Sequence, residues 1–169
     1  MIAATYSGGV LSLAINDEPI QSSGAQSVYQ SAIDELTRRY GADDATWQLD
    51  LDEFTPPLGI ILVARVDTHP AGCVGVRAIS SHALHLGEVK RLWVRPDLRR
   101  SGVAAALMDE IEQRARTAGY RQLYLETGDA QPEARALYPK LSWIQVDDFP
   151  PGAFSHPSAF RFTKVLQAN

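Results

Sequence analysis

The stretch of residues 88–107 constrains the fold of this chain more than any other part of the sequence. Its first part, residues 88–94, is rich in strand-forming side chains, above all in the run Leu92-Trp93-Val94. Pro96 ends this strand, because proline has no N–H group for a ladder hydrogen bond. A helix then opens at residue 103, and its apolar residues fall on one face. That face is made of Val103, Leu107, Met108, Ile111 and Ala115.

Strict alternation along residues 88–94 predicts two faces for the strand, because successive side chains of a strand point to opposite sides. On this pattern one face carries Val89, Arg91 and Trp93. The opposite face carries Glu88, Lys90, Leu92 and Val94.

The turn between strand and helix, residues 99–104, has the composition of an anion site. The first N–H groups of a helix have no partner within it, and the helix dipole adds about half a positive charge there. Gly102 allows close approach of a ligand, and Arg99 and Arg100 add positive charge. The pattern indicates pyrophosphate binding, with an ordinary helix start as the alternative. A P-loop and a dinucleotide-binding GxGxxG motif are both missing from the sequence.

Composition narrows the class of protein. A length of 169 residues is enough for one domain with a real core, expected over residues 1–169. A net charge of −4 and a pI near 5.5 argue against a nucleic-acid partner. No apolar run approaches 18 residues and no signal peptide is evident, so we expect a cytoplasmic protein with no membrane partner. The lone Cys73 is expected to be a buried hydrophobe, and His82 and His85 match no zinc spacing, so no metal is predicted.

Hydrophobic periodicity predicts an α/β fold built on one mixed sheet. Acidic residues 42–57 are expected to form a loop, either simply solvated or attracting a cationic amine, with Trp47 and Phe54 as anchors or pocket walls. Strands are expected at 11–15, 59–66, 71–78, 88–94, 122–126, 142–146 and 159–166, and helices at 25–40, 103–119 and 131–141.

Two signatures resemble those of the GCN5-related N-acetyltransferases, the GNAT family. Arg99-x-x-Gly102-x-Ala104 resembles the family's [QR]-x-x-G-x-[GA] motif. The run Gln131-x-x-Ala134-x-x-Leu137-Tyr138 resembles its N-x-x-A-x-x-L-Y motif, with Gln131 at the Asn position. The likeness covers residues 59–166, the expected cofactor core, and leaves residues 1–58 as an N-terminal strand, helix and substrate-side loop. It implies a GNAT-like fold in which the central parallel strands, residues 88–94 and 122–126, splay apart around acetyl-CoA.

The resemblance also implies roles for individual residues. Tyr138 corresponds to the family's proton donor to the CoA sulfur, with the alternative that it simply completes the apolar face of Ala134, Leu137 and Leu141. Glu88 lies in register with the glutamate base of the histone-modifying branch, and Glu126 or a water chain is the alternative base. Without a catalytic role, Glu88 is expected to be an exposed strand-edge acid paired with Lys90 or Arg91. Main-chain groups of Leu92 and Val94 would hold the pantetheine arm and supply an oxyanion donor. The remaining cofactor contacts implied are Trp93, Arg99, Arg100, Ser101, Gly102, Val103, Ala104, Ala105, Gln131 and Tyr138 itself.

The function implied is acetyl-CoA-dependent acetylation of a primary amine, on a small molecule or an amino terminus. Pro139 departs from the family pattern: it is expected to push Tyr138 out of helical geometry and to displace its hydroxyl. This departure favours the alternative of a non-catalytic acyl-CoA-binding domain. A nucleic-acid-binding module is the third reading, which the low pI opposes. Many relatives pair through their C-terminal strands, so a homodimer is compatible with the resemblance.

Overall fold

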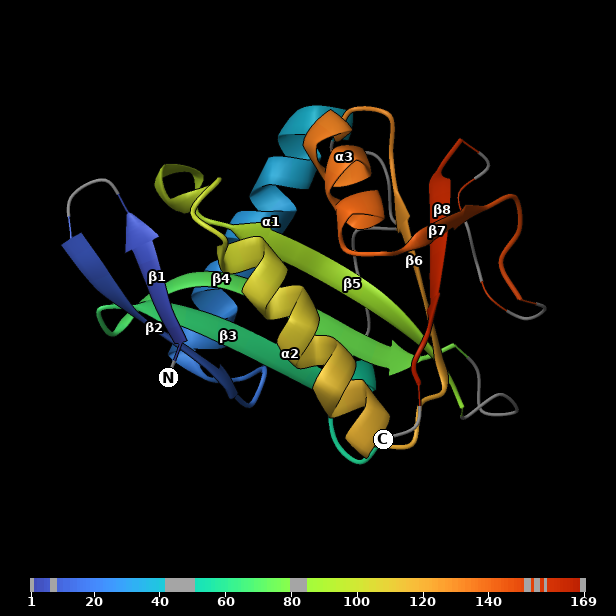
Figure 1. Cartoon of the computed structure of the whole chain (residues 1–169), viewed down its shortest axis with the longest axis horizontal. Coiled ribbons are helices and arrows are strands. Elements are labelled where there is room, and N and C mark those ends of the chain that lie inside the picture. The colour runs from blue at the N-terminus through green and yellow to red at the C-terminus, as the bar shows by residue number, and fades with distance from the viewer. Residues whose placement is uncertain are drawn as a thin grey trace.

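One mixed sheet organises the part of the chain that the structure describes. The structure is a computed structural model, and it describes residues 2–6, 9–41, 51–79, 85–150, 153, 156 and 158–167 (Figure 1). Within these residues eight strands lie in the order β1-β2-β3-β4-β5-β6-β8-β7. The strands are β1 Ile2–Tyr6, β2 Gly9–Asp17, β3 Ile60–Val66, β4 His69–Ala78, β5 Leu86–Val94, β6 Gln122–Thr127, β7 Ile144–Val146 and β8 Phe160–Val165. The predicted α/β class and mixed sheet are confirmed.

Two long helices cover opposite faces of the sheet. Helix α1 (Ser23–Tyr40) lies behind β3, β4 and β5 in Figure 1, and α2 (Val103–Thr117) lies in front of them. The Ser22 hydroxyl caps α1 by accepting a hydrogen bond from the Ala25 N–H at 3.1 Å. Gly41, with φ +93°, ends α1 as predicted. Helix α3 (Pro132–Lys140) stands beyond the end of β6, and short 3₁₀ turns occupy Leu51–Phe54 and Pro96–Leu98.

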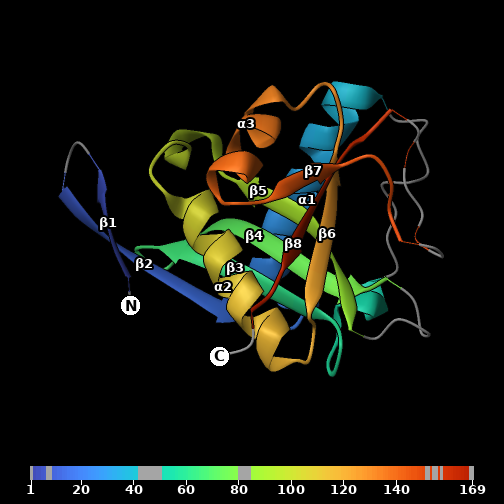
Figure 2. The ribbon, with the colours of Figure 1, turned by 45° about the vertical axis from the view of Figure 1, so that its right-hand side comes forward.

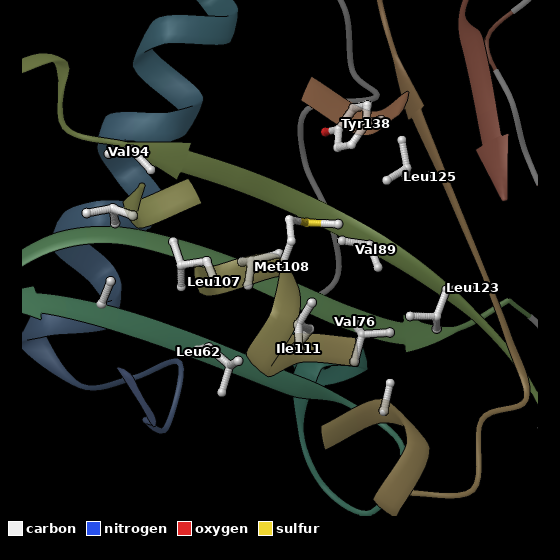
Figure 3. Close-up of a cluster of buried hydrophobic side chains, with 14 of the residues drawn as sticks. Leu62, Val76, Val89, Val94, Leu107, Met108, Ile111, Leu123, Leu125 and Tyr138 are labelled. Carbon is white, nitrogen blue, oxygen red and sulfur yellow. The ribbon is translucent and has the colours of Figure 1, made fainter. Parts of the chain in front are cut away.

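The larger core lies between α2 and the sheet. Leu107, Met108 and Ile111 of α2 are fully buried against side chains of β3, β4 and β5, as Figure 3 shows. Each such side chain stabilises the fold by about 1.5–3 kcal/mol relative to exposure. The apolar face predicted for this helix is confirmed, because all five of its members are buried: Val103, Leu107, Met108, Ile111 and Ala115.

A smaller core lies between α1 and the other face of the sheet. Phe54 is one of its members, so the prediction of an anchor is confirmed for that residue. Its ring packs so closely on Gly75 that a Cβ there would lie 2.7 Å from ring carbons. Cys73 is buried in the same cluster, as predicted, and burial raises the pKa of its thiol to about 12. Trp47 lies outside the described residues.

The N-terminal region and several element ends differ from the prediction. β2 is longer than the predicted strand at 11–15, and its partner β1 was not predicted at all. The two strands form an antiparallel hairpin at one edge of the sheet, which projects from the body in Figure 2. The run of β1, IAATY, lacks the alternation by which a half-buried strand is recognised. His85 is exposed as expected, and His82 falls outside the described residues.

Candidate functional site

The parallel strands β5 and β6 part from one another, and this gap is the candidate site. They pair only at Leu86↔Gln122, Gly87↔Leu123 and Glu88↔Tyr124. Beyond Glu88, β5 continues to Val94 and β6 to Thr127 without further pairing to each other. Figures 1 and 2 show the strands meeting at one end and diverging toward α3. The predicted splay is confirmed, and it leaves main-chain donors and acceptors of the facing edges for a ligand.

A β-bulge in β5 overturns the predicted alternation. Cys73 of β4 opposes Trp93 and Gly75 opposes Lys90, so two steps along β4 match three along β5. Arg91 takes up the extra residue with φ +60°. The prediction was therefore wrong about which side chains share a face. Val89 lies on the α2 side together with Leu92 and Val94, whereas Arg91 and Trp93 lie on the α1 side.

The turn before α2 has the geometry expected of an anion site. Gly102 is the N-cap of α2 with φ +92°, a left-handed conformation that favours glycine. Apart from Gly102 itself and its immediate chain neighbours, no described residue contacts the position that a Cβ would occupy there. The N–H groups of Val103, Ala104 and Ala105 occupy the first turn, where helical partners are lacking. Backbone donors, helix dipole and open space therefore coincide at this point.

Polar side chains of the turn differ in how they are held. Ser101 donates its hydroxyl hydrogen to the Leu98 carbonyl at 2.6 Å, inside the turn itself. Arg99 donates from Nε to the Val94 carbonyl at 2.9 Å and reaches back toward α1 with its guanidinium. Arg100 is exposed, with φ +67°. Of the two predicted cations, Arg99 is thus fixed by the fold and Arg100 faces solvent.

Both predicted base candidates meet at the apex of the gap. Lys90 Nζ lies 2.6 Å from Glu88 Oε1 and 3.1 Å from Glu126 Oε1, so one lysine links the two strands. The other Glu88 oxygen accepts from Arg77 Nη2 at 2.9 Å, and Arg77 also pairs with Glu53. Glu88 is only 3% exposed. The expected pairing of Glu88 with Lys90 is confirmed, but the expected exposure of Glu88 is wrong. The sequence did not reveal that Lys90 also contacts Glu126 or that Arg77 binds Glu88.

Tyr138 is buried beside the gap, and α3 continues past it. The helix includes Pro139 and ends at Lys140, so the prediction that Pro139 pushes Tyr138 out of helical geometry is wrong. Pro139 is the second-last residue of the helix, so only Lys140 follows any kink that the proline introduces. The Tyr138 ring lies 5.3 Å from that of Phe162, and Figure 3 shows it above Leu125 with the hydroxyl directed toward the side where β5 ends. Burial raises the pKa of Tyr138 above its usual range.

Gln131 lies just before α3, where β6 leads into the helix. Its side-chain oxygen accepts from the Thr127 hydroxyl at 3.2 Å and from the Tyr40 hydroxyl at 3.5 Å. Gly128 lies directly under the Tyr40 ring, and a Cβ there would overlap the phenol oxygen. The residue predicted to contact a cofactor is therefore already oriented by α1 and β6.

Glu35 of α1 is a polar residue of this region that the sequence did not reveal. Its carboxylate accepts from Trp93 Nε1 at 2.8 Å, pairs with Arg39 at 2.5 Å and contacts Arg99. Burial alone would raise the pKa of Glu35, but hydrogen bonds from Arg99, Trp93 and Arg39 hold it below the ordinary value. Only the Arg39 spacing, four residues along a helix, was visible in the sequence. The other two partners are 58 and 64 residues away.

The predicted residues thus gather around one gap. The turn before α2 lies at the end of β5, Gln131 and Tyr138 belong to the β6–α3 side, and Glu88 and Glu126 mark the apex. In the same described part of the chain, no group of three or more His, Cys, Asp and Glu side chains could hold a metal ion. No described helix is long and apolar enough to cross a membrane.

Comparison with known proteins places these features in a family. A model described as "Acetyltransferase (GNAT) family" matches residues 25–143. An IAA acetyltransferase from Azospirillum brasilense is 35% identical over 134 residues, which cover 78% of this chain and 86% of that protein.

Solved structures share the fold at lower identity. An acetyltransferase of the GNAT family from Staphylococcus aureus superposes with a TM-score of 0.74 at 14% identity, covering 92% of this chain and 100% of that one. The PaiA N-acetyltransferase from Thermoplasma acidophilum, solved in complex with coenzyme A, gives a TM-score of 0.67 at 15% identity and covers 91% and 99% of the two chains.

Proposed function

The chain belongs to the GNAT family of acetyltransferases, and from that premise we propose that it transfers the acetyl group of acetyl-CoA to a primary amine. The acceptor is a small molecule or an amino terminus. The observation that carries this proposal is the gap between β5 and β6, which opens directly onto the Gly102 turn. A strand edge for the pantetheine amides and a helix N-terminus for the pyrophosphate are thereby provided side by side.

The residues of the gap fit the cofactor. Main-chain N–H groups of Val103, Ala104 and Ala105 would bind the pyrophosphate, and the open space at Gly102 admits it. Main-chain groups of Leu92 and the Val94 N–H would hold the pantetheine arm, since β6 does not pair with β5 there and the Val94 carbonyl already accepts from Arg99. Bound acetyl-CoA supplies an acetyl group already activated as a thioester.

Tyr138 is the proposed proton donor to the departing CoA sulfur. A phenol carries its proton at neutral pH, so the Tyr138 hydroxyl would have one to donate to the thiolate as it forms. The C–S bond would break as the amine nitrogen bonds to the acetyl carbon, and the sulfur would receive the Tyr138 proton. The Tyr138 phenolate would then take up the second proton that the nitrogen loses, which restores the phenol. A main-chain N–H of Leu92 or Val94 is the proposed donor to the negative charge that develops on the acetyl oxygen.

A base is needed, because an alkyl amine with a pKa near 10.4 is less than about 0.1% neutral at pH 7. Glu88, or a water molecule, is the proposed proton acceptor, with Glu126 as the second carboxylate. Both carboxylates contact Lys90 at the apex of the gap, so one cation orients the two candidates. The proton taken from the amine leaves through this polar cluster to solvent.

A non-catalytic acyl-CoA-binding domain is the second candidate function. The feature that favoured it was Pro139, which was expected to remove Tyr138 from the helix. Helix α3 continues through Pro139 and keeps Tyr138 buried beside the gap, which supports the enzyme instead.

Thermal melting with and without acetyl-CoA tests the cofactor site. At about 100 times Kd, a ligand of the native state adds about 2.7 kcal/mol, a rise of roughly 5–11 °C for a chain of this length. Gly102→Val should abolish the rise. Gly119→Val is the matched control, because Gly119 has φ +97°, equally open space and a place at the other end of α2. That control should lose baseline stability but keep the rise.

Thiol release then separates the enzyme from a binding domain. Purified protein is incubated with acetyl-CoA and a panel of primary amines, and free CoA thiol is measured. Release that depends on an amine supports the transferase. A full thermal shift with no release for any amine would favour the binding domain, and no shift at millimolar acetyl-CoA would remove both functions.

A further inference from the structure

The C-terminal half of α1 contacts the β5 side of the gap. Glu35 accepts a hydrogen bond from Trp93 Nε1 at 2.8 Å and contacts the guanidinium of Arg99. Arg99 is also bound through Nε to the Val94 carbonyl, at the last residue of β5. One carboxylate of α1 is thus joined to the end of the strand and to the turn that precedes α2.

The same half of α1 contacts the β6 side of the gap. Arg39 pairs with Glu133 in the first turn of α3 at 2.5 Å, and its Nη1 donates to the Ala130 carbonyl at 2.6 Å. Tyr40 adds its hydrogen bond to Gln131 at 3.5 Å. Both residues that receive Arg39 belong to the segment that follows β6.

Glu35 and Arg39 are themselves paired at 2.5 Å across one helical turn. The chain of contacts therefore runs unbroken from the Arg99 turn through Glu35 and Arg39 to the start of α3. From this continuity we propose that the Glu35–Arg39 pair is a strut that sets the width of the gap, and that Glu35 is a positioning residue for the cofactor. The inference rests on the proposed function, because it concerns how the acetyl-CoA site is held.

The position of the strut explains why such a device is useful. Ladder pairing between β5 and β6 stops at Glu88, and the Lys90 bridge lies close to that apex. Farther along, the two segments that would grip the cofactor are Gly102 with its turn on one side and Gln131 with α3 on the other. Separation of these segments is not fixed by pairing of the two strands, so a cross-link at the open end has the greatest effect on it.

Burial and multiple partners restrict the movement of the Glu35 and Arg39 side chains. The Glu35 side chain is 12% exposed and that of Arg39 is 22% exposed, so the pair is less screened by salt than a surface ion pair. Arg39 uses two nitrogens of a planar fork for three partners, which restricts its orientation. A site held in its binding geometry before the ligand arrives loses less entropy on binding.

The test is the affinity for CoA, measured by titration calorimetry on the wild-type chain, Glu35→Gln, Arg39→Gln and the double variant. A strut predicts that each single variant weakens CoA binding about 5- to 10-fold. The double variant should bind about as weakly as the weaker single one, because either change breaks the same link. Direct charge effects predict something else. Removing the Glu35 charge would strengthen binding of an anion and removing the Arg39 charge would weaken it.

Arg39→Lys sharpens the test because it keeps the positive charge but lacks the fork that reaches Glu35, Glu133 and Ala130 together. A strut predicts weakening here too. The matched control is the Glu110–Arg114 pair of α2, which has the same i, i+4 spacing at 2.7 Å. Glu110→Gln and Arg114→Gln should leave CoA affinity within about twofold of wild type.

The outcomes distinguish failure of the proposed function from failure of the strut. Wild-type protein that does not bind CoA would overturn the proposed function and the strut with it. Wild-type binding with unchanged affinity in all Glu35 and Arg39 variants would overturn the strut alone, as would changes of opposite sign. If Glu35→Gln does not fold, as judged by its melting curve, Arg39→Lys decides: weakened binding supports the strut and wild-type affinity overturns it.

Discussion

The two faces of the sheet are stabilised by different kinds of side-chain interaction. On the α2 face, Leu107, Met108 and Ile111 fill an apolar layer with no exposed surface. On the α1 face, an apolar patch is flanked by charged side chains that pair across the gap, with Glu35 at its open end and Lys90 at its apex. Burial and dispersion dominate the first face, whereas the second combines a smaller apolar cluster with specific ion pairs around the gap.

The two faces differ in how far their side chains can be substituted. An apolar layer is insensitive to which neighbour supplies each methyl group, provided that the space is filled. A carboxylate such as Glu35 needs specific hydrogen-bond and ion-pair partners in a fixed geometry, because an unpaired buried charge is costly. The α1 face therefore has less freedom to vary around the gap.

The largest expected effect is on kcat, at Tyr138. This residue is an exception to the contrast between the two faces, because it belongs to the apolar cluster but is proposed to act as a general acid. Tyr138→Phe should lower kcat about 10²- to 10⁴-fold, because the general acid is lost, while the melting temperature stays near that of the wild type. Steady-state kinetics with the best amine of the panel measures it.

Tyr120 is the matched control, because it is a buried tyrosine of the same cluster whose hydroxyl donates to the Leu58 carbonyl at 2.6 Å. Tyr120→Phe should leave kcat unchanged and cost about 1 kcal/mol of stability. An unchanged kcat in Tyr138→Phe would return the α2 face to a purely structural role.

The next effect concerns stability of the apolar face. Leu107→Ala should lower the free energy of unfolding by about 2–5 kcal/mol, because a fully buried side chain is replaced by a cavity. Urea unfolding in about 0.1 M and about 1 M NaCl should give the same loss, since no charge is involved. A loss that depends on salt would show that the layer is coupled to the ion pairs on the other face.

The smallest effect concerns the charged face. Lys90→Met should lower the free energy of unfolding by about 1–3 kcal/mol, because Glu88 and Glu126 lose the cation between them. Their repulsion is partly screened, so the loss should shrink in high salt, unlike that of Leu107→Ala.

Lys140→Met, at an exposed lysine of α3, serves as the control for charge and should be close to neutral. Equal losses for Lys90→Met in low and high salt would mean that packing of the lysine stem, rather than its charge, matters at the apex.

The same division explains what the sequence could predict. Helix periodicity identifies Val103, Leu107 and Ile111 as one buried face, because burial repeats every 3.6 residues whatever the partner. The Gly102 turn was visible because a backbone-based anion site needs a glycine at a fixed place. Glu35 was not, since its partners Trp93 and Arg99 come together only after α1 has packed on the sheet.

Arg91 was the least predictable residue of the site. A left-handed φ at an arginine has no local sequence signal, and here it follows from the register of β5 against β4. At Pro139 the sequence suggested a disturbance of the helix that the structure does not show. The effect of a proline on a helix depends on how many residues follow it, and the end of a helix is poorly defined by sequence.

The bulge at Arg91 also has a practical consequence for engineering. In a regular strand, a designer who wants to change only the acceptor side would randomise every second residue. Here that rule reverses within β5: Glu88 and Arg91, three positions apart, share the α1 side, whereas Val89 and Leu92 share the other. A mutant library for one face must therefore shift its choice of alternate residues by one position at Arg91. A one-residue deletion there would move the side chains on one side of the bulge to the opposite face of the sheet.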